Sequence, residues 1–204
     1  METTIDRQVI LQKRITAEDK SENRKFVTHT IAPVWNSESR ILILGTMPSP
    51  ASRAAGFFYM HAQNRFWPVL AQIFGEEFLH RNNDADKKAA IEERIAFLEC
   101  RHIALWDVLS ECEITGASDS SINKELPNDF SEILAASKIA HIFCTGKTAF
   151  NLYKKHCAKK YGTTFSYLPS TSPANQSAWP TEKLAEEYKR EILKFIQTSQ
   201  PHSL

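Results

Sequence analysis

The sequence predicts a three-layer α/β/α sandwich around a short, four-stranded parallel sheet. Short apolar runs bounded by Gly, Pro or Ser alternate with stretches of helical periodicity. Such alternation is typical of right-handed βαβ units, which bury a parallel sheet between two layers of helices. The chain has 204 residues, 42% of them hydrophobic, which suits one domain with a full core.

The predicted strands are β-branched or apolar runs of four to six residues, short enough for a buried strand. Each of the first three precedes a helical pattern, so their carboxyl ends should share one edge of the sheet. The four strands are Ile41–Leu44, His102–Trp106, Ile139–Cys144 and Thr164–Leu168.

The predicted helices show apolar residues at helical spacing. Thr181 is expected to be the N-cap of the last one, since a threonine hydroxyl can accept a bond from a free backbone N–H. The four helices are Phe66–Phe74, Asp86–Cys100, Lys147–Lys160 and about Thr181–Ile196.

We expect one catalytic domain over residues 36–198, preceded by an N-terminal arm or peripheral helix (1–35) and followed by a tail (199–204). No apolar run reaches the roughly 20 residues that span a bilayer, and the N-terminus lacks a secretory pattern. We therefore expect a cytoplasmic protein without membrane contact.

The cysteines are too far apart in sequence to form a C-x-x-C pair for zinc or an iron–sulfur cluster. We expect reduced thiols, mostly in or near the core, and no metal. They are Cys100, Cys112, Cys144 and Cys157.

The net charge is only +1, yet charge is unevenly distributed. Residues 41–75 contain two arginines and no acid, residues 133–181 contain six lysines and no acid, and fourteen of the 24 acidic residues lie between Glu76 and Glu132. If the two acid-free stretches share a surface, a polyanion can dock there. The alternative is a solvated helix face.

Two loops follow predicted strands directly and should meet at the ligand-binding edge. Gly45–Pro50 has a glycine and two prolines, which force a tight turn with free backbone amides. Ser170–Asn175 lies in a stiff, hydroxyl-rich stretch that can approach a phosphate backbone closely. An ordinary connection between a strand and a helix is the alternative interpretation of this second loop.

These loops carry a family resemblance. Gly45–Ser49, followed by GFFYMHAQNRFW at 56–67, resembles motif one of the uracil-DNA glycosylase superfamily. The nearest branches are the mismatch-specific uracil/thymine glycosylases and the hypoxanthine (deoxyinosine) DNA glycosylases, and Ser170–Asn175 resembles the motif-two loop of the second branch. Weaker matches bring the resemblance to roughly residues 38–195. They are Leu105–Leu109, Ser118–Asn123, Pro127–Asp129 and Gly146.

The resemblance implies a monofunctional DNA glycosylase of base excision repair. Such an enzyme flips a deaminated base, here hypoxanthine, out of double-stranded DNA and hydrolyses its N-glycosidic bond. We expect a monomer that needs no cofactor. The alternatives are a mismatch uracil/thymine-type glycosylase of the same fold, or a damaged-DNA-binding module without activity.

One difference from the mismatch-specific enzymes indicates the branch of the superfamily and the catalytic residue. Met47 stands where the mismatch-specific enzymes carry a catalytic asparagine, and a thioether is a weak acceptor that cannot hold a water. The resemblance makes Asn64 the candidate for positioning the water, although it can instead only cap the following helix. Asp107 can orient water or steady the cation, and His61 can assist departure of the base. Each also has a structural interpretation, as a turn or packing residue.

The remaining assignments follow the same resemblance. Tyr59 is expected to stack on the flipped base with Phe58 as support, while backbone amides around Thr46 and Met47 bind the base edge. Residues 176–179 are the expected wedge, and Phe57, Phe66 and Trp67 are expected in the core. The expected DNA contacts are Ser49, Ser52, Ser170, Ser172, Asn175 and Lys147.

Overall fold

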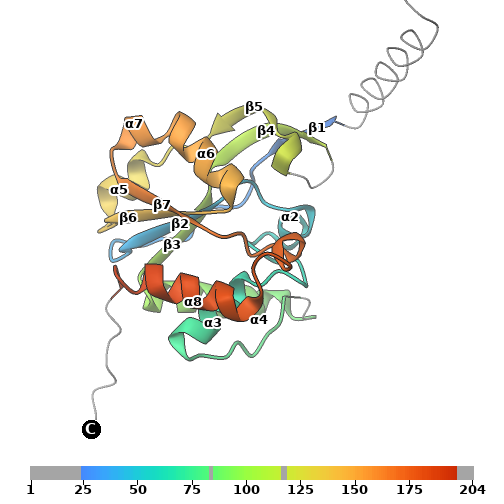
Figure 1. Ribbon diagram of the computed structural model, residues 1–204, viewed down its shortest axis with the longest axis vertical. Coiled ribbons are helices and arrows are strands. Elements are labelled where there is room, and N and C mark those ends of the chain that lie inside the picture. Colours follow the sequence, from blue (N-terminus) through green and yellow to red (C-terminus); the bar gives the residue numbers. More distant parts are fainter. Residues whose placement is uncertain (1–23, 83–84, 116–118, 197–204) are drawn as a thin grey trace, which may run out of the picture.

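The computed structural model describes residues 24–82, 85–115 and 119–196 (Figure 1). Its centre is a parallel sheet with the strand order β3-β2-β6-β7, which confirms the predicted fold class and all four strands to within two residues. The strands are β2 (Ile41–Gly45), β3 (Ile103–Asp107), β6 (His141–Thr145) and β7 (Thr164–Leu168).

The central strand β2 shows why a continuous apolar run forms here. Ile41 and Ile43 pack into one buried cluster and Leu42 and Leu44 into another, because successive side chains point to opposite faces. Helices α3 (Phe66–Phe74), α4 (Lys87–Cys100) and α8 (Thr181–Ile192) cover one face; α5 (Ser131–Ala136), α6 (Lys147–His156) and α7 (Ala158–Tyr161) lie on the other (Figure 1).

Some predicted helix boundaries were wrong. The helix expected over Lys147–Lys160 is divided into α6 and α7 at the buried Cys157, and α8 ends at Ile192. Thr181 is the first helical residue and not the N-cap, because Pro180 occupies that position. Proline fixes the extended backbone that precedes a helix without supplying a capping hydroxyl.

A second sheet was not predicted. It is antiparallel, with the order β1-β4-β5, and contains β1 (Arg24–Thr28), β4 (Leu109–Thr115) and β5 (Asn123–Pro127). In β4 the buried residues alternate with partly exposed ones such as Glu111 and Glu113. Because one face of this sheet meets solvent, its strands carry no continuous apolar run.

Short elements complete the chain: α2 (Pro50–Ala55) and the 3-10 turns η1 (Asp119–Ser121) and η2 (Pro173–Asn175). Of the arm expected over residues 1–35, only residues 24–35 are described, and β1 pairs there with β4. The expected tail at 199–204 lies outside the described residues.

All four cysteines are free thiols, and three of them are buried, as expected; Cys100 is exposed. Among the described residues, no helix combines the length and the apolar character that a bilayer crossing requires.

Candidate active site

The loops that follow β2 and β7 meet at the carboxyl edge of the parallel sheet. Arg65, directly before α3, joins them: its guanidinium donates to the carbonyl oxygen of Ser172 at 3.1 Å and to that of Trp179. The Arg65 amide also donates to the Thr171 carbonyl oxygen at 3.2 Å. One buried arginine therefore fastens the second loop to the first.

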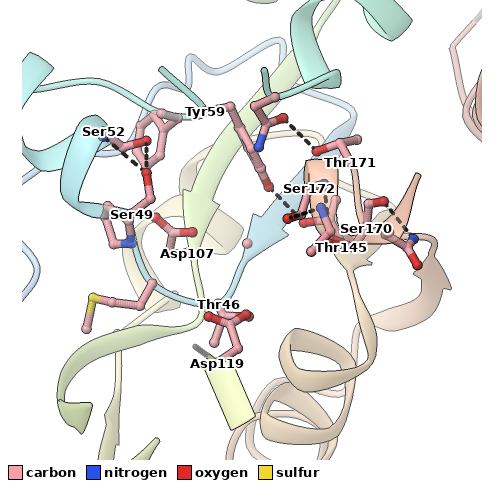
Figure 2. A pocket seen from close by; sticks show the side chains of 17 residues that line it. Thr46, Ser49, Ser52, Tyr59, Asp107, Asp119, Thr145, Ser170, Thr171 and Ser172 are labelled. Carbon is pink, nitrogen blue, oxygen red and sulfur yellow. Dashed lines mark hydrogen bonds between the residues drawn. The ribbon is translucent and has the colours of Figure 1, made fainter. Parts of the chain in front are cut away.

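Between these loops lies a cavity of about 490 Å³ (Figure 2). This volume falls within the usual range for small-molecule sites. Its walls come from the ends of β2, β3 and β6, the loop around α2, η1 and the loop after β7. The lining residues are Gly45, Thr46, Met47, Pro48, Ser49, Ser52, Phe58, Tyr59, Asn64, Asp107, Asp119, Thr145, Ser170, Thr171, Ser172, Ala174 and Asn175.

Asp107 is the buried acid of the cavity, 4% exposed at the end of β3. The chain turns at Val108, whose amide donates to the Gly45 carbonyl oxygen at 2.9 Å, and enters β4. The Asn128 side chain donates to the carbonyl oxygens of Asp107 and Leu109, at 3.0 and 3.1 Å. These bonds lock the backbone that presents the carboxylate.

The Asp107 carboxylate has one engaged and one open oxygen. Its Oδ2 lies 2.9 Å from Nε2 of His29, while no described hydrogen bond uses Oδ1. A methyl group at Gly45 would lie 2.2 Å from Oδ1, so only glycine leaves room for this oxygen above the end of β2. Burial raises the pKa of Asp107, and the hydrogen bond with His29 opposes that rise.

Tyr59 is held rigidly on the cavity wall. Its hydroxyl lies 2.8 Å from Oγ1 of Thr145, and that Oγ1 in turn donates to the Leu44 carbonyl oxygen, so the tyrosine hydroxyl is the donor in the pair. The ring stacks on Phe66 with centroids 3.9 Å apart. The backbone adopts φ 55°, a left-handed conformation that is unusual for tyrosine and that these contacts maintain.

Asn64 also lines the cavity, but its amide oxygen is occupied. Oδ1 accepts from the Phe66 amide and from Oγ1 of Thr171, both at 2.9 Å. A carbonyl oxygen has two lone pairs, so the Nδ2 group, which has no described partner, is what Asn64 can offer to a ligand. Asn64 is not the N-cap of α3, because Arg65 occupies that position; Asn64 contacts the first helical amide from one residue further away.

The loop after β2 supplies further donors. The amides of Thr46 and Met47 have no acceptor among the described residues, and both residues line the cavity. The carboxyl group of Asp119, an exposed residue of η1, turns toward Thr46 (Figure 2). Partial burial raises the pKa of Asp119, the hydrogen bond with Thr46 lowers it, and the charge of Asp107 raises it.

The small polar residues expected to contact DNA are gathered here, but several are engaged in bracing the loops. Ser52 is 2% exposed, and its Oγ accepts from Ser49 Oγ at 3.1 Å and from the Met60 amide at 3.2 Å. Ser172 Oγ accepts from the Ala174 amide, and the Asn175 side chain donates to the Ser170 carbonyl oxygen. Ser52 is thus a structural residue of the first loop.

Other expected site residues lie away from the cavity. His61 is exposed, does not line the cavity, and accepts a bond from the Gln63 amide at its Nδ1. Lys147 is exposed at the start of α6, next to Gly146, whose backbone passes close to Ser170. Of the expected wedge, residues 176–178 are exposed, whereas Trp179 packs on the core beneath Lys183.

The expected basic surface is partly neutralised by acidic side chains. Lys155 pairs with Glu125 of β5, and Lys160 pairs with Asp129 at 3.2 Å. Both acids come from the acid-rich stretch, which folds against α6 and α7. Lys147, Lys154 and Lys159 have no described ion pair.

Sequence reasoning missed His29 and Thr145, and it assigned no separate role to Gly45 or Thr171. Thr145 ends the third predicted strand, so its place at the ligand edge could have been inferred. His29 gave no local signal, because its partner is 78 residues away. In the described part of the chain, no three His, Cys, Asp or Glu side chains form a cluster that could hold a metal ion.

Comparisons with known proteins identify the family. A family model described as "Uracil DNA glycosylase superfamily" matches residues 32–197. A protein of Methanosarcina barkeri named hypoxanthine DNA glycosylase is 30% identical over 161 residues, which cover 78% of this chain and 96% of that protein. Its counterpart in Methanosarcina acetivorans, of the same name, is 29% identical over 143 residues, covering 70% and 85%.

Among solved structures, one from Methanosarcina acetivorans is similar. This solution NMR structure, provisionally described as a uracil DNA glycosylase, has a TM-score of 0.66 and 26% identity, and the match covers 84% of this chain and 99% of the other. The family match spans both loops and every strand of the parallel sheet. The chain therefore belongs to the uracil DNA glycosylase superfamily and is a DNA glycosylase.

Proposed function

We propose that this enzyme flips hypoxanthine out of double-stranded DNA and hydrolyses its N-glycosidic bond without a covalent intermediate. The observation that carries the proposal is the open Asp107 Oδ1, buried in a base-sized cavity between two loops of a glycosylase fold. The substrate preference follows the two relatives named hypoxanthine DNA glycosylase.

The cavity offers a stacking surface and donors for a flipped base. One face of Tyr59 is covered by Phe66, and the residue lines the cavity, so a base can stack against it. The amides of Thr46 and Met47 and the Nδ2 of Asn64 can donate to the carbonyl oxygen and ring nitrogens of hypoxanthine. These donors would stabilise the negative charge that develops on the departing base.

Asp107 is the group best suited to activate the water. A nucleophilic water needs an acceptor for its proton, and Asp107 Oδ1 is open, whereas the Asn64 oxygen is doubly occupied. We therefore assign the water to Asp107 and a donor role toward the base to Asn64, which changes the role that the family resemblance suggested.

In this scheme the glycosidic bond breaks with its electron pair on the base nitrogen. The oxygen of water then bonds to C1′, and its proton passes to Asp107 Oδ1. The base leaves as an anion or takes up that proton. No lysine stands among the described lining residues, so no Schiff base is expected. The negative Asp107 also steadies the oxocarbenium-like sugar.

DNA would bind around the mouth of the cavity. Ser49, Ser170, Ser172 and Asn175 lie in the two loops, and Lys147 stands beside the second one. We propose direct or water-mediated phosphate contacts from this group and insertion of the exposed residues 176–178 into the base stack. We further propose that the enzyme acts as a monomer in the cytoplasm.

Uracil is the second candidate base. Hypoxanthine and uracil share an N–H beside a carbonyl oxygen, and the family and the structural neighbour are described by uracil. The test is cleavage of oligonucleotides that contain hypoxanthine, uracil, xanthine or thymine opposite each normal base. We expect the highest single-turnover rate on hypoxanthine. A higher rate on uracil would replace the proposed substrate, and binding without any abasic product would refute hydrolysis altogether.

A further inference from the structure

His29 lies just after β1, in the segment to which sequence reasoning gave only a peripheral position. Its side chain is 2% exposed, and its Nε2 lies 2.9 Å from Oδ2 of Asp107. The ring packs between Phe58 and Trp106, with centroid distances of 6.1 and 6.2 Å. The end of β1 in the antiparallel sheet thus places a buried imidazole beside Asp107.

The position of the imidazole proton follows from the partners of the ring. The Ile31 amide points at Nδ1 at 3.2 Å, and a backbone N–H can only donate. Nδ1 is therefore the acceptor, and the ring proton is on Nε2 and is donated to Asp107 Oδ2. A carboxylate that accepts this bond is favoured over a protonated carboxyl group.

The surroundings of Asp107 otherwise oppose ionisation. Burial raises its pKa, and the bond from His29 acts in the opposite direction. The other titratable groups at this position are the Asp119 carboxyl of η1, which adds a like charge, and the Tyr59 hydroxyl, which donates to Thr145. Of these groups, only His29 offers a donor to the carboxylate.

We propose that His29 is a positioning residue for glycosidic hydrolysis: it fixes Asp107 through Oδ2, directs Oδ1 into the cavity and keeps the carboxylate ionised as the proton acceptor. The inference rests on the function proposed above for Asp107. His29 does not contact the substrate; it sets the protonation state and the orientation of the group that does.

The test uses the full chain with His29→Leu and His29→Gln. Leucine removes the donor, whereas the glutamine amide nitrogen can reach the position of Nε2. In single-turnover cleavage of a hypoxanthine duplex, we expect His29→Leu to lower the rate at every pH, because Oδ1 is no longer directed into the cavity, and to move the acid limb of the pH–rate profile up by about one pH unit. We expect His29→Gln to restore most of the original profile.

A loss of rate in His29→Leu with an unmoved acid limb and no restoration by glutamine would overturn the proposal, as would a wild-type profile. Thermal unfolding of both variants shows whether the fold persists. NMR of the free protein gives a readout that needs no activity. In the wild type we expect a proton on Nε2 and none on Nδ1 of His29. In His29→Leu we expect the Asp107 carboxyl group to titrate with a higher midpoint pH. If the midpoint moves but no deaminated base is cleaved, the proposed function fails; if cleavage occurs and the midpoint stays, the role of His29 fails.

Discussion

Gly45→Ala tests whether Asp107 must occupy its observed place. The new methyl carbon would lie 2.2 Å from Asp107 Oδ1 and 3.0 Å from the Tyr59 hydroxyl oxygen. Strand β2 cannot retreat, because it is paired with β3 on one side and β6 on the other. The carboxylate must therefore move by roughly 1 Å, a displacement that can cost about a hundredfold in rate.

The expected result is a loss of turnover far larger than the loss of stability. Overpacking of this kind costs about 1–3 kcal/mol of folding free energy, so the protein should remain folded. Gly45 does not have a positive φ, and alanine brings no backbone strain there. The assay is single-turnover cleavage of a hypoxanthine duplex, together with duplex affinity and thermal unfolding.

The matched control is Gly75→Ala, at the end of α3. Gly75 has φ 68°, and nothing lies within 4 Å of an added methyl group. Alanine there costs about 1–2 kcal/mol through its left-handed backbone and leaves the cavity intact. We expect wild-type turnover below its unfolding temperature. If Gly45→Ala also turned over normally, the Oδ1 position would be irrelevant to catalysis.

Further substitutions probe the other parts of the site. Asn64→Asp keeps an acceptor for the Phe66 amide and removes the Nδ2 donor, so we expect it to reduce the rate about as much as Asn64→Ala does; a rate near wild type would show that the donor is unused. Tyr59→Phe removes the bond to Thr145 and keeps the stacking ring, so a loss of about tenfold or less is expected from one hydrogen bond, with a larger loss for Tyr59→Ala. Lys147→Ala should weaken duplex binding and reduce the slope of log affinity against log salt concentration by about one, as measured by fluorescence anisotropy. Lys155→Ala should have a smaller effect, because Glu125 already pairs with that lysine, and equal effects of the two substitutions would contradict this assignment.

The sequence was most informative about elements whose structure depends on residues close together in the chain. The parallel strands are buried on both faces, so their runs of apolar residues stand out, and the ends of such strands locate the ligand edge. The two loops and Asp107 could therefore be placed at one edge of the sheet from the sequence alone. The antiparallel sheet could not, because β4 alternates buried Cys112 and Ile114 with Glu111 and Glu113.

The roles within the site depend on contacts between distant segments. The amide oxygen of Asn64 is occupied by Thr171, 107 residues away, and no local pattern shows that. Likewise, Asp107 faces the cavity because it is confined by His29, just after β1, and by Gly45 at the end of β2. Sequence reasoning could thus nominate both side chains but not decide which one has a free acceptor.

The measurement that tests the central claim most directly is the single-turnover rate of Asp107→Asn on a hypoxanthine-containing duplex with enzyme in excess. Asparagine preserves the shape and removes the proton acceptor. We predict a rate lower by about 10²–10⁴-fold with nearly unchanged duplex affinity. A rate within the scatter of the wild type would show that the water is activated elsewhere and would contradict the proposed mechanism.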